Sequence, residues 1–214
     1  MTNKFFKRNT KYRGDDRELY FTPINVVEKI VESLLEHRPY LKNKIWVDPC
    51  AGDGRWQNVI EKYKIKCYSF DICPLSSGVG LSDFLKDTRW VQDNLFFIGN
   101  PPFSLLEKFV AKALHLTEEC YFLGGSQAIA NSLAGKVSLL HRFEGFEGNQ
   151  KDLRSKILFN DTFNEDVFVW CCGALFNRKF HNNFKIITEK DETNFRISIQ
   201  NYCIPDDRVV VINK

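Results

Sequence analysis

Apolar residues along the chain follow two spacings, one helical and one typical of buried strands. In residues 24–37, INVVEKIVESLLEH, they recur every three or four positions, which predicts a helix that Thr22 caps and Pro23 begins. Residues 45–47 and the stretch KCYSFDI are short apolar runs bounded by turn residues, which predicts strands. The alternation continues with a helix over 55–63, a strand in NLFFIGN, a helix in SLLEKFVAKALHL and a strand in ECYFLGG.

The later part of the chain is richer in strand signals. DVFVWCCGALF is apolar throughout, which predicts a central strand, and FKIIT, FRISIQNYC and RVVVIN carry weaker strand patterns. Residues 130–165 are polar, charged and contain glycine, which predicts a long loop, and long loops inside compact domains are often functional. Strands that alternate with helices predict an α/β fold with a mostly parallel, doubly wound sheet. We expect one domain over residues 20–214, after a basic segment at 1–19.

Charge is distributed unevenly. The net charge of +3 and the pI of about 8.4 do not by themselves indicate a nucleic-acid partner. The first thirteen residues, however, hold five basic residues and no acid, interleaved with Phe5, Phe6 and Tyr12. That composition suits phosphate pairing and base stacking, and it is equally typical of a solvated terminus. The candidate nucleic-acid contacts are Lys4, Lys7, Arg8, Lys11 and Arg13.

Cysteine and histidine usage argues against a metal site. The seven cysteines form no CxxC pair and the four histidines are scattered, so we expect neither a disulfide framework nor a metal centre. No run of eighteen apolar residues predicts a membrane span. These features together predict a cytoplasmic protein that does not enter a membrane.

Three turns follow predicted strands, at the sheet edge where α/β proteins bind ligands. The first is DPCAGDG at 48–54, whose glycines allow a ligand to approach the backbone. The second is Asp71, placed to accept hydrogen bonds from a ribose diol. The third is NPPF at 100–103, where two prolines make a stiff corner. Each turn alone has an ordinary structural explanation, but their order along one chain indicates a function.

With these motifs in this order, the chain resembles the S-adenosylmethionine-dependent amino-methyltransferases, in particular the adenine-N6 branch, over roughly residues 18–125. The resemblance implies a Rossmann-like class I methyltransferase fold with an antiparallel C-terminal strand. It implies S-adenosyl-L-methionine as cofactor, bound by YFTP, the glycine turn, FDI and SDF. The implied cofactor residues are Tyr20, Phe21, Thr22, Pro23, Asp48, Cys50, Ala51, Gly52, Asp53, Gly54, Asp71, Ile72, Asp83 and Phe84.

NPPF matches the catalytic motif of that family, so the resemblance assigns the chemistry to Asn100, Pro101, Pro102 and Phe103. An exocyclic amine on an aromatic ring is a poor nucleophile because the ring delocalises its lone pair. The Asn100 side-chain oxygen and the Pro101 backbone oxygen can accept its N–H groups and localise that pair. Pro102 holds the peptide rigid and Phe103 can stack on the base.

The expected substrate is adenine in nucleic acid, with DNA favoured over RNA. Methylation of a protein glutamine and a non-catalytic, methyltransferase-fold partner are the other hypotheses. No segment long enough for a separate target-recognition domain follows ECYFLGG. Recognition is therefore expected to fall to a recognition or lid loop around 130–165, to the basic N-terminus, to a partner subunit or to a homodimer.

Overall fold

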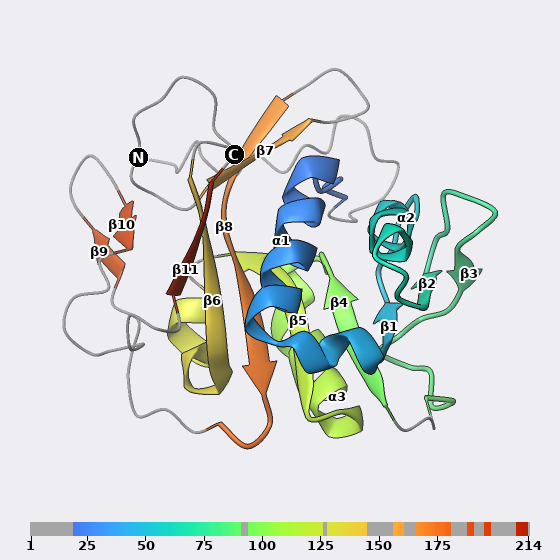
Figure 1. Ribbon diagram of the computed structural model, residues 1–214. Helices are drawn as coiled ribbons and strands as arrows, with labels where there is room; N and C mark the ends of the chain where they lie inside the picture. Colours follow the sequence, from blue (N-terminus) through green and yellow to red (C-terminus); the bar gives the residue numbers. More distant parts are fainter. Residues whose placement is uncertain are drawn as a thin grey trace.

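The protein folds around one large β-sheet with helices on its faces (Figure 1). The description rests on a computed structural model. It covers residues 19–90, 94–125, 128–144, 156–160, 166–180, 188–190, 195–197 and 209–213.

The first half of the chain alternates strands with helices, as predicted. Its helical elements are α1 (Ile24–His37), the 3-10 turn η3 (Pro39–Asn43), α2 (Arg55–Lys62), the 3-10 turn η4 (Phe103–Leu105) and α3 (Leu106–Leu116). Its strands are β1 (Ile45–Asp48), β2 (Cys67–Asp71), β3 (Gly80–Leu81), β4 (Leu95–Gly99) and β5 (Glu119–Gly125).

The second half is dominated by strands. Two short helical turns, η5 (Ile129–Leu133) and η6 (Ala134–Lys136), lead into β6 (Val137–Glu144). The remaining strands are β7 (Lys156–Asn160), β8 (Asp166–Asn177), β9 (Thr188–Lys190), β10 (Phe195–Ile197) and β11 (Val209–Asn213). Of the three weaker strand signals, FRISIQNYC and RVVVIN contain β10 and β11, whereas most of FKIIT lies outside the described residues.

The strand order of the main sheet is β11-β6-β8-β5-β4-β1-β2-β3, and β7 pairs with β8. The run from β5 to β3 is parallel throughout, and β11 is parallel to β6. β8 is antiparallel to β5, β6 and β7. The predicted α/β class, with a mostly parallel sheet and an antiparallel strand toward the C-terminus, is therefore confirmed. Because β1, β2 and β4 are parallel, their C-terminal ends lie at one edge of the sheet.

Alternate residues of the central strands feed two separate hydrophobic cores. Trp46, Phe96 and Tyr121 point into the core formed with α1 and α2. Val47 and Phe97, one position along, point into the core formed with α3. Figure 1 shows α1 lying across one face of the strands. Both faces of the central strands are thus buried, which explains why their sequences are almost wholly apolar.

The prediction of a long loop over 130–165 is wrong for the strands β6 and β7. The polar residues of β6 interrupt the apolar pattern expected of a buried strand. They can be buried because their hydrogen-bond partners lie within the fold. Ser138 Oγ donates to the Leu175 carbonyl at 3.1 Å, and the His141 ring nitrogens are hydrogen-bonded to Tyr121 and Ser33 at 2.9 and 3.2 Å. The proposed role of this region in recognition stays a prediction.

Candidate active site

The DPCAGDG turn joins the end of β1 to the start of α2. Gly52 and Gly54 have φ angles of 54° and 84°, in the left-handed region that disfavours side chains, and Gly54 immediately precedes α2. The Ala51 N–H donates to the Phe70 carbonyl at 2.9 Å, so β2 holds the middle of the turn. The glycines therefore serve the backbone shape that the sequence indicated.

Asp71 lies at the end of β2 and locks the same turn. Its Oδ2 accepts a hydrogen bond from the Gly52 N–H at 2.8 Å, and its Oδ1 accepts one from the Cys73 N–H at 2.7 Å. Two of the three predicted ligand-binding turns are thus in direct contact. Each carboxylate oxygen keeps a second lone pair, so the assignment of Asp71 to a ribose diol stays a prediction.

Asp48, the first residue of the turn, is completely buried. Its Oδ1 accepts the Cys50 N–H at 3.1 Å, and its Oδ2 is buried with no hydrogen-bond partner among the described residues. Burial raises the pKa of this carboxyl to about 7; the hydrogen bonds from Cys50 oppose the shift, and the negative charges of Asp71 and Asp53 add to it. The carboxyl also lies against β4, because a Cβ added to Gly99 would be 2.5 Å from Oδ1.

Asn100 follows β4 directly, and only the nitrogen of its side-chain amide has a hydrogen-bond partner among the described residues. The Nδ2 group donates to the Tyr20 carbonyl at 2.9 Å. The Oδ1 atom is buried and has no partner among the described residues. A carbonyl can only accept a hydrogen bond, so this contact fixes which end of the amide is the oxygen. Asn100 consequently presents an unused acceptor at the ligand-binding edge of the sheet.

The aromatic ring of Phe103 is placed by the segment that precedes α1. Its centroid lies 6.1 Å from that of Tyr20, with the rings tilted by 35°. A Cβ added to Gly125, at the end of β5, would lie 3.6 Å from Phe103 Cδ2. Pro102 has φ −51° and ψ 125°, the extended geometry expected of the corner. The structure thus brings Tyr20 beside Asn100 and Phe103 of the NPPF motif.

Residues 20–23, which we call the strap, are also fastened to the glycine turn. The Arg55 guanidinium donates to the Thr22 carbonyl at 3.0 Å, and its carbon atom lies 4.5 Å from the centroid of the Phe21 ring. The same guanidinium pairs with Asp53 at 2.7 Å. Burial alone would raise the pKa of Asp53, but its hydrogen bonds with Arg55 outweigh that effect and the pKa is lowered. Arg55 was not singled out by the sequence, which offers no local sign of its long-range contacts.

Thr22 does not cap α1 as predicted. The helix is preceded by Pro23 rather than beginning with it, and no side chain caps it. The Thr22 Oγ1 instead accepts the indole N–H of Trp56 at 3.3 Å. Trp56 is a core residue that also holds the strap, and this burial explains why the threonine serves a tertiary contact rather than a cap.

The residues expected around the cofactor's adenosine have mixed surroundings. Ile72 is 59% exposed just past β2, so its apolar surface is open to a ligand. Asp83 accepts the Leu85 N–H at 3.1 Å and pairs with Lys86. Phe84 is only 2% exposed and packs on Trp90, Phe97 and Phe109. Its ring therefore supports the site from the core, and contact with an adenine stays a prediction.

Trp90 is a further residue that the sequence reasoning missed. Its ring meets those of Phe70 and Phe84 edge-on, at centroid distances of 5.1 and 5.8 Å. Its indole N–H is buried without a partner among the described residues. No recognised motif surrounds Trp90, so only the fold could bring it to this cluster.

Several predictions fall outside the described residues. Lys4, Lys7, Arg8, Lys11 and Arg13 all lie there, as does much of 130–165. Within the described part of the chain, no helix is long and apolar enough to cross a membrane, and no group of three or more metal-binding side chains gathers. The six cysteines described are free thiols.

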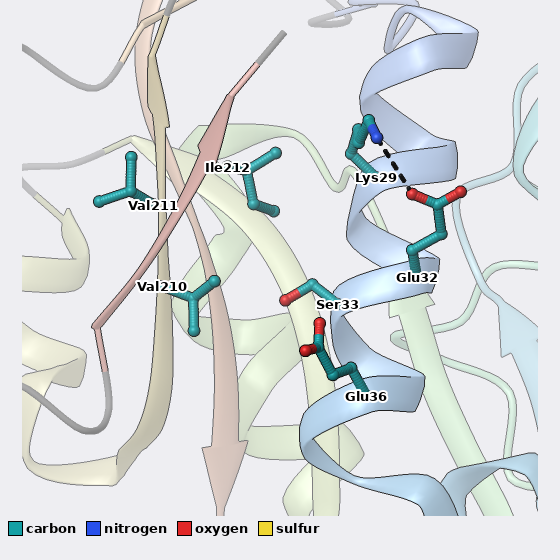
Figure 2. Close-up of a pocket in the computed structure, with 7 residues that line it drawn as sticks. All are labelled: Lys29, Glu32, Ser33, Glu36, Val210, Val211 and Ile212. Carbon is teal, nitrogen blue, oxygen red and sulfur yellow. Dashed lines mark hydrogen bonds and ion pairs between the residues drawn. The ribbon is translucent and has the colours of Figure 1, made fainter.

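A separate hollow of ≈ 300 Å³ lies between α1 and β11 (Figure 2). It is lined by Lys29, Glu32, Ser33, Glu36, Val210, Val211 and Ile212. The strand order separates β11 from β1 by β6, β8, β5 and β4, so this hollow is distinct from the site at the glycine turn.

Solved structures share this architecture. A candidate RNA methyltransferase from Pyrococcus horikoshii matches with a TM-score of 0.53 and 15% identity, over 75% of this chain and 86% of that one. The methyltransferase subunit of a type I restriction-modification system from Streptococcus thermophilus also gives 0.53, with 10% identity over 79% of this chain. The chain has the methyltransferase fold. It spans 47% of the length of the restriction-modification subunit. No protein-family model and no curated protein matches the sequence.

The site residues fit the cofactor of that fold. The buried acceptor Asp48 Oδ2 lacks a partner among the described residues, and a ligand with N–H groups or positive charge would satisfy it. The left-handed Gly52 and Gly54 leave the turn without side chains at two positions. These are the features expected beneath a compact cationic ligand.

Proposed function

We propose that this protein is an S-adenosylmethionine-dependent methyltransferase that acts on the N6 amine of adenine in nucleic acid. The observation that carries the proposal is the state of Asn100, whose amide is anchored through Nδ2 while Oδ1 is buried with no partner among the described residues. The cofactor, when bound, supplies an electrophilic methyl group. The residues of the chain supply the geometry that makes a weak nucleophile react.

An exocyclic amine donates two N–H groups, and acceptors aimed at both favour a tetrahedral nitrogen with a localised lone pair. Asn100 Oδ1 is one such acceptor, and the Pro101 carbonyl is the proposed second. A fixed dipole that needs no reorientation lowers the barrier most effectively. The Tyr20 carbonyl provides that fixation, since Asn100 cannot rotate its amide without losing the 2.9 Å hydrogen bond.

Phe103 is the proposed platform for the base. Its ring is partly buried against the sheet and beside Tyr20, so it is held in place before substrate arrives. Stacking on an aromatic side chain contributes about 1–3 kcal/mol per base. That amount is comparable to the cost of extracting a base from a duplex, roughly a few kcal/mol.

DNA is the favoured polymer, with RNA as the alternative. The descriptions of two proteins with this fold name a restriction-modification methyltransferase subunit and a candidate RNA methyltransferase. The compact chain with the motif order YFTP, DPCAGDG and NPPF resembles small DNA enzymes. The basic residues near the N-terminus are the proposed phosphate contacts.

The test is transfer of a labelled methyl group from S-adenosylmethionine to four separate substrates: duplex DNA, single-stranded DNA, total RNA and a protein extract. We expect label in a nucleic acid, with DNA ahead of RNA. Label confined to protein would replace the proposal with glutamine methylation. Measurable cofactor binding with no label in any pool would instead point to a required partner subunit or to a non-catalytic role.

A further inference from the structure

The Asp48 carboxyl is buried between the glycine turn and the end of β4. It lies at the end of β1, fully buried, with the Cys50 thiol and backbone on one side. On the other side lies the backbone of Gly99, where an added Cβ would sit 2.5 Å from Asp48 Oδ1 and 3.2 Å from Cys50 Sγ. The residue that follows Gly99, just past the end of β4, is Asn100. Asp48 is thus placed where the cofactor turn meets the proposed catalytic motif.

Among the described residues, the groups that influence Asp48 offer it no positive charge. The titratable neighbours that influence it are Cys50 and Asp53 from the turn and Asp71 and Cys67 from β2. Arg55, the basic residue at the start of α2, is committed to Asp53, Thr22 and Phe21. Ionised Asp48 would therefore be a buried negative charge beside two other carboxylates, which is unfavourable unless a cation enters.

Asp48 Oδ2 marks where that cation would be received. It is buried and unpartnered among the described residues, whether Asp48 is ionised or protonated. The burial of this carboxyl raises its pKa to about 7, so a large fraction of the cofactor-free protein holds a proton there at neutral pH. A ligand that carries positive charge would make the ionised form the favourable one.

We propose that Asp48 is a proton-linked acceptor for the positively charged amino-acid portion of the cofactor, and that binding releases one proton from its carboxyl to solvent. The proposal rests on the proposed use of S-adenosylmethionine, and it adds a coupling between cofactor affinity and pH. No covalent bond other than the O–H of Asp48 changes. Because the carboxyl touches the backbone next to Asn100, its ionisation also sets the charge beside the proposed catalytic amide.

Calorimetric titration of the full chain with S-adenosylmethionine tests this, at about pH 6 and about pH 7.5, in phosphate and in imidazole, two buffers that can take up a proton at both values. Between these values the ligand's own ammonium stays mostly protonated. We expect a dissociation constant roughly five- to tenfold higher at the lower pH. The apparent binding enthalpy at the lower pH should differ between the buffers by the heat of transferring close to one proton. S-adenosylhomocysteine, which keeps the ammonium and lacks the sulfonium, shows which cation is responsible.

The matched variants are Asp48→Asn and Glu28→Gln. Asp48→Asn should bind with little dependence on pH or buffer, whereas Glu28→Gln removes an exposed helix carboxylate and should keep both dependences. In the event that Asp48→Asn does not fold, the carboxyl ¹³C resonance of Asp48 in the unaltered protein should titrate near neutral pH and cease to do so with cofactor bound. Tight binding that ignores pH and buffer would overturn the inference and leave the proposed function intact. Absence of cofactor binding at either pH would overturn the proposed function itself.

Discussion

The side-chain amide of Asn100 has its two ends in different surroundings. Its nitrogen is tied to the Tyr20 carbonyl, and its oxygen is buried with no partner among the described residues. An unpaired buried acceptor costs about 1–3 kcal/mol, so its presence at a strand end favours a functional reason. The proposed reason is that the oxygen accepts a hydrogen bond from an N–H group of the substrate.

Replacing Asn100 by Ala should lower methyl transfer roughly 100-fold or more, because one preorganised group in a reaction site contributes on that order. Cofactor affinity should stay close to that of the unaltered protein, since the amide faces the substrate. Rate and cofactor binding are measured on the same preparation. Asn58→Ala, on the exposed face of α2, is the control and should change neither. Full activity of the Asn100→Ala variant would remove the residue from the catalytic assignment.

For single residues, the sequence indicated where the candidate site residues lie better than it indicated their burial or protonation. Asn100, Asp48 and Asp71 were predicted from their places after strands, and the structure brings them to one edge of the sheet. The protonation of Asp48 depends on burial by β2 and β4, which no local pattern encodes. Phe84 packs in the core, and its contact with the cofactor stays a prediction, because an aromatic residue after a strand looks the same in both settings.

The strap is the element that connects the two halves of the site. Tyr20 holds the Asn100 amide, while Phe21 and Thr22 are held by Arg55 beside the glycine turn. Arg55 is also paired with Asp53 inside that turn. One side chain thus joins the proposed cofactor turn to the segment that orients the proposed catalytic amide.

Arg55→Ala should weaken cofactor binding roughly tenfold, because it removes hydrogen bonds from a charged donor that contribute about 1.5–3 kcal/mol each in favourable cases. Methyl transfer at saturating cofactor should also fall, since the strap no longer fixes Asn100. The measurements are the cofactor dissociation constant and the rate at saturation. The matched control is Lys62→Ala. Lys62 lies on α2, like Arg55, and the substitution removes an exposed ion pair with Glu28 of α1. Equal affinity in the Arg55→Ala and Lys62→Ala variants would contradict the role of the strap.

The spacing of apolar residues predicted the helices and strands well where the buried positions are apolar. The helices α1, α2 and α3 and the strands β1, β2, β4 and β5 are where the apolar spacing placed them, whereas the two-residue strand β3 was not predicted. It failed at β6, where Ser138 and His141 are polar and completely or nearly buried. Their hydrogen bonds to Leu175, Tyr121 and Ser33 come from distant parts of the chain, so the strand resembled a loop in the sequence.

For the whole molecule, two buried titratable groups, Asp48 and His141, have opposite effects on how the free energy of unfolding depends on pH. Asp48 has a pKa raised to about 7 by burial, so it contributes stability below its unfolded pKa and loses it as pH rises toward 7. His141 has a pKa lowered to about 3, first by burial and then by the charge of His37. Its contribution is present above the unfolded value of about 6.5 and is lost as pH falls. Between about pH 4 and pH 6.5, the changes in the free energy of unfolding with pH that are due to Asp48 and to His141 nearly cancel.

Single variants should reveal each slope. In the cofactor-free protein, Asp48→Asn should leave the His141 term, so the free energy of unfolding falls by roughly 1 kcal/mol per unit on acidification. His141→Gln should leave the Asp48 term and show the opposite trend. Urea unfolding at several values across that range measures both. Parallel pH profiles for the two variants would contradict the assigned protonation states.

Product analysis shows directly whether a methyl group is transferred to the exocyclic amine of adenine. Nucleic acid incubated with the protein and S-adenosylmethionine is digested to nucleosides, and the methylated product is identified by mass spectrometry. We expect N6-methyladenine, formed by the unaltered protein and not by Asn100→Ala. A methyl group on cytosine, on another position of adenine or on protein glutamine would contradict it.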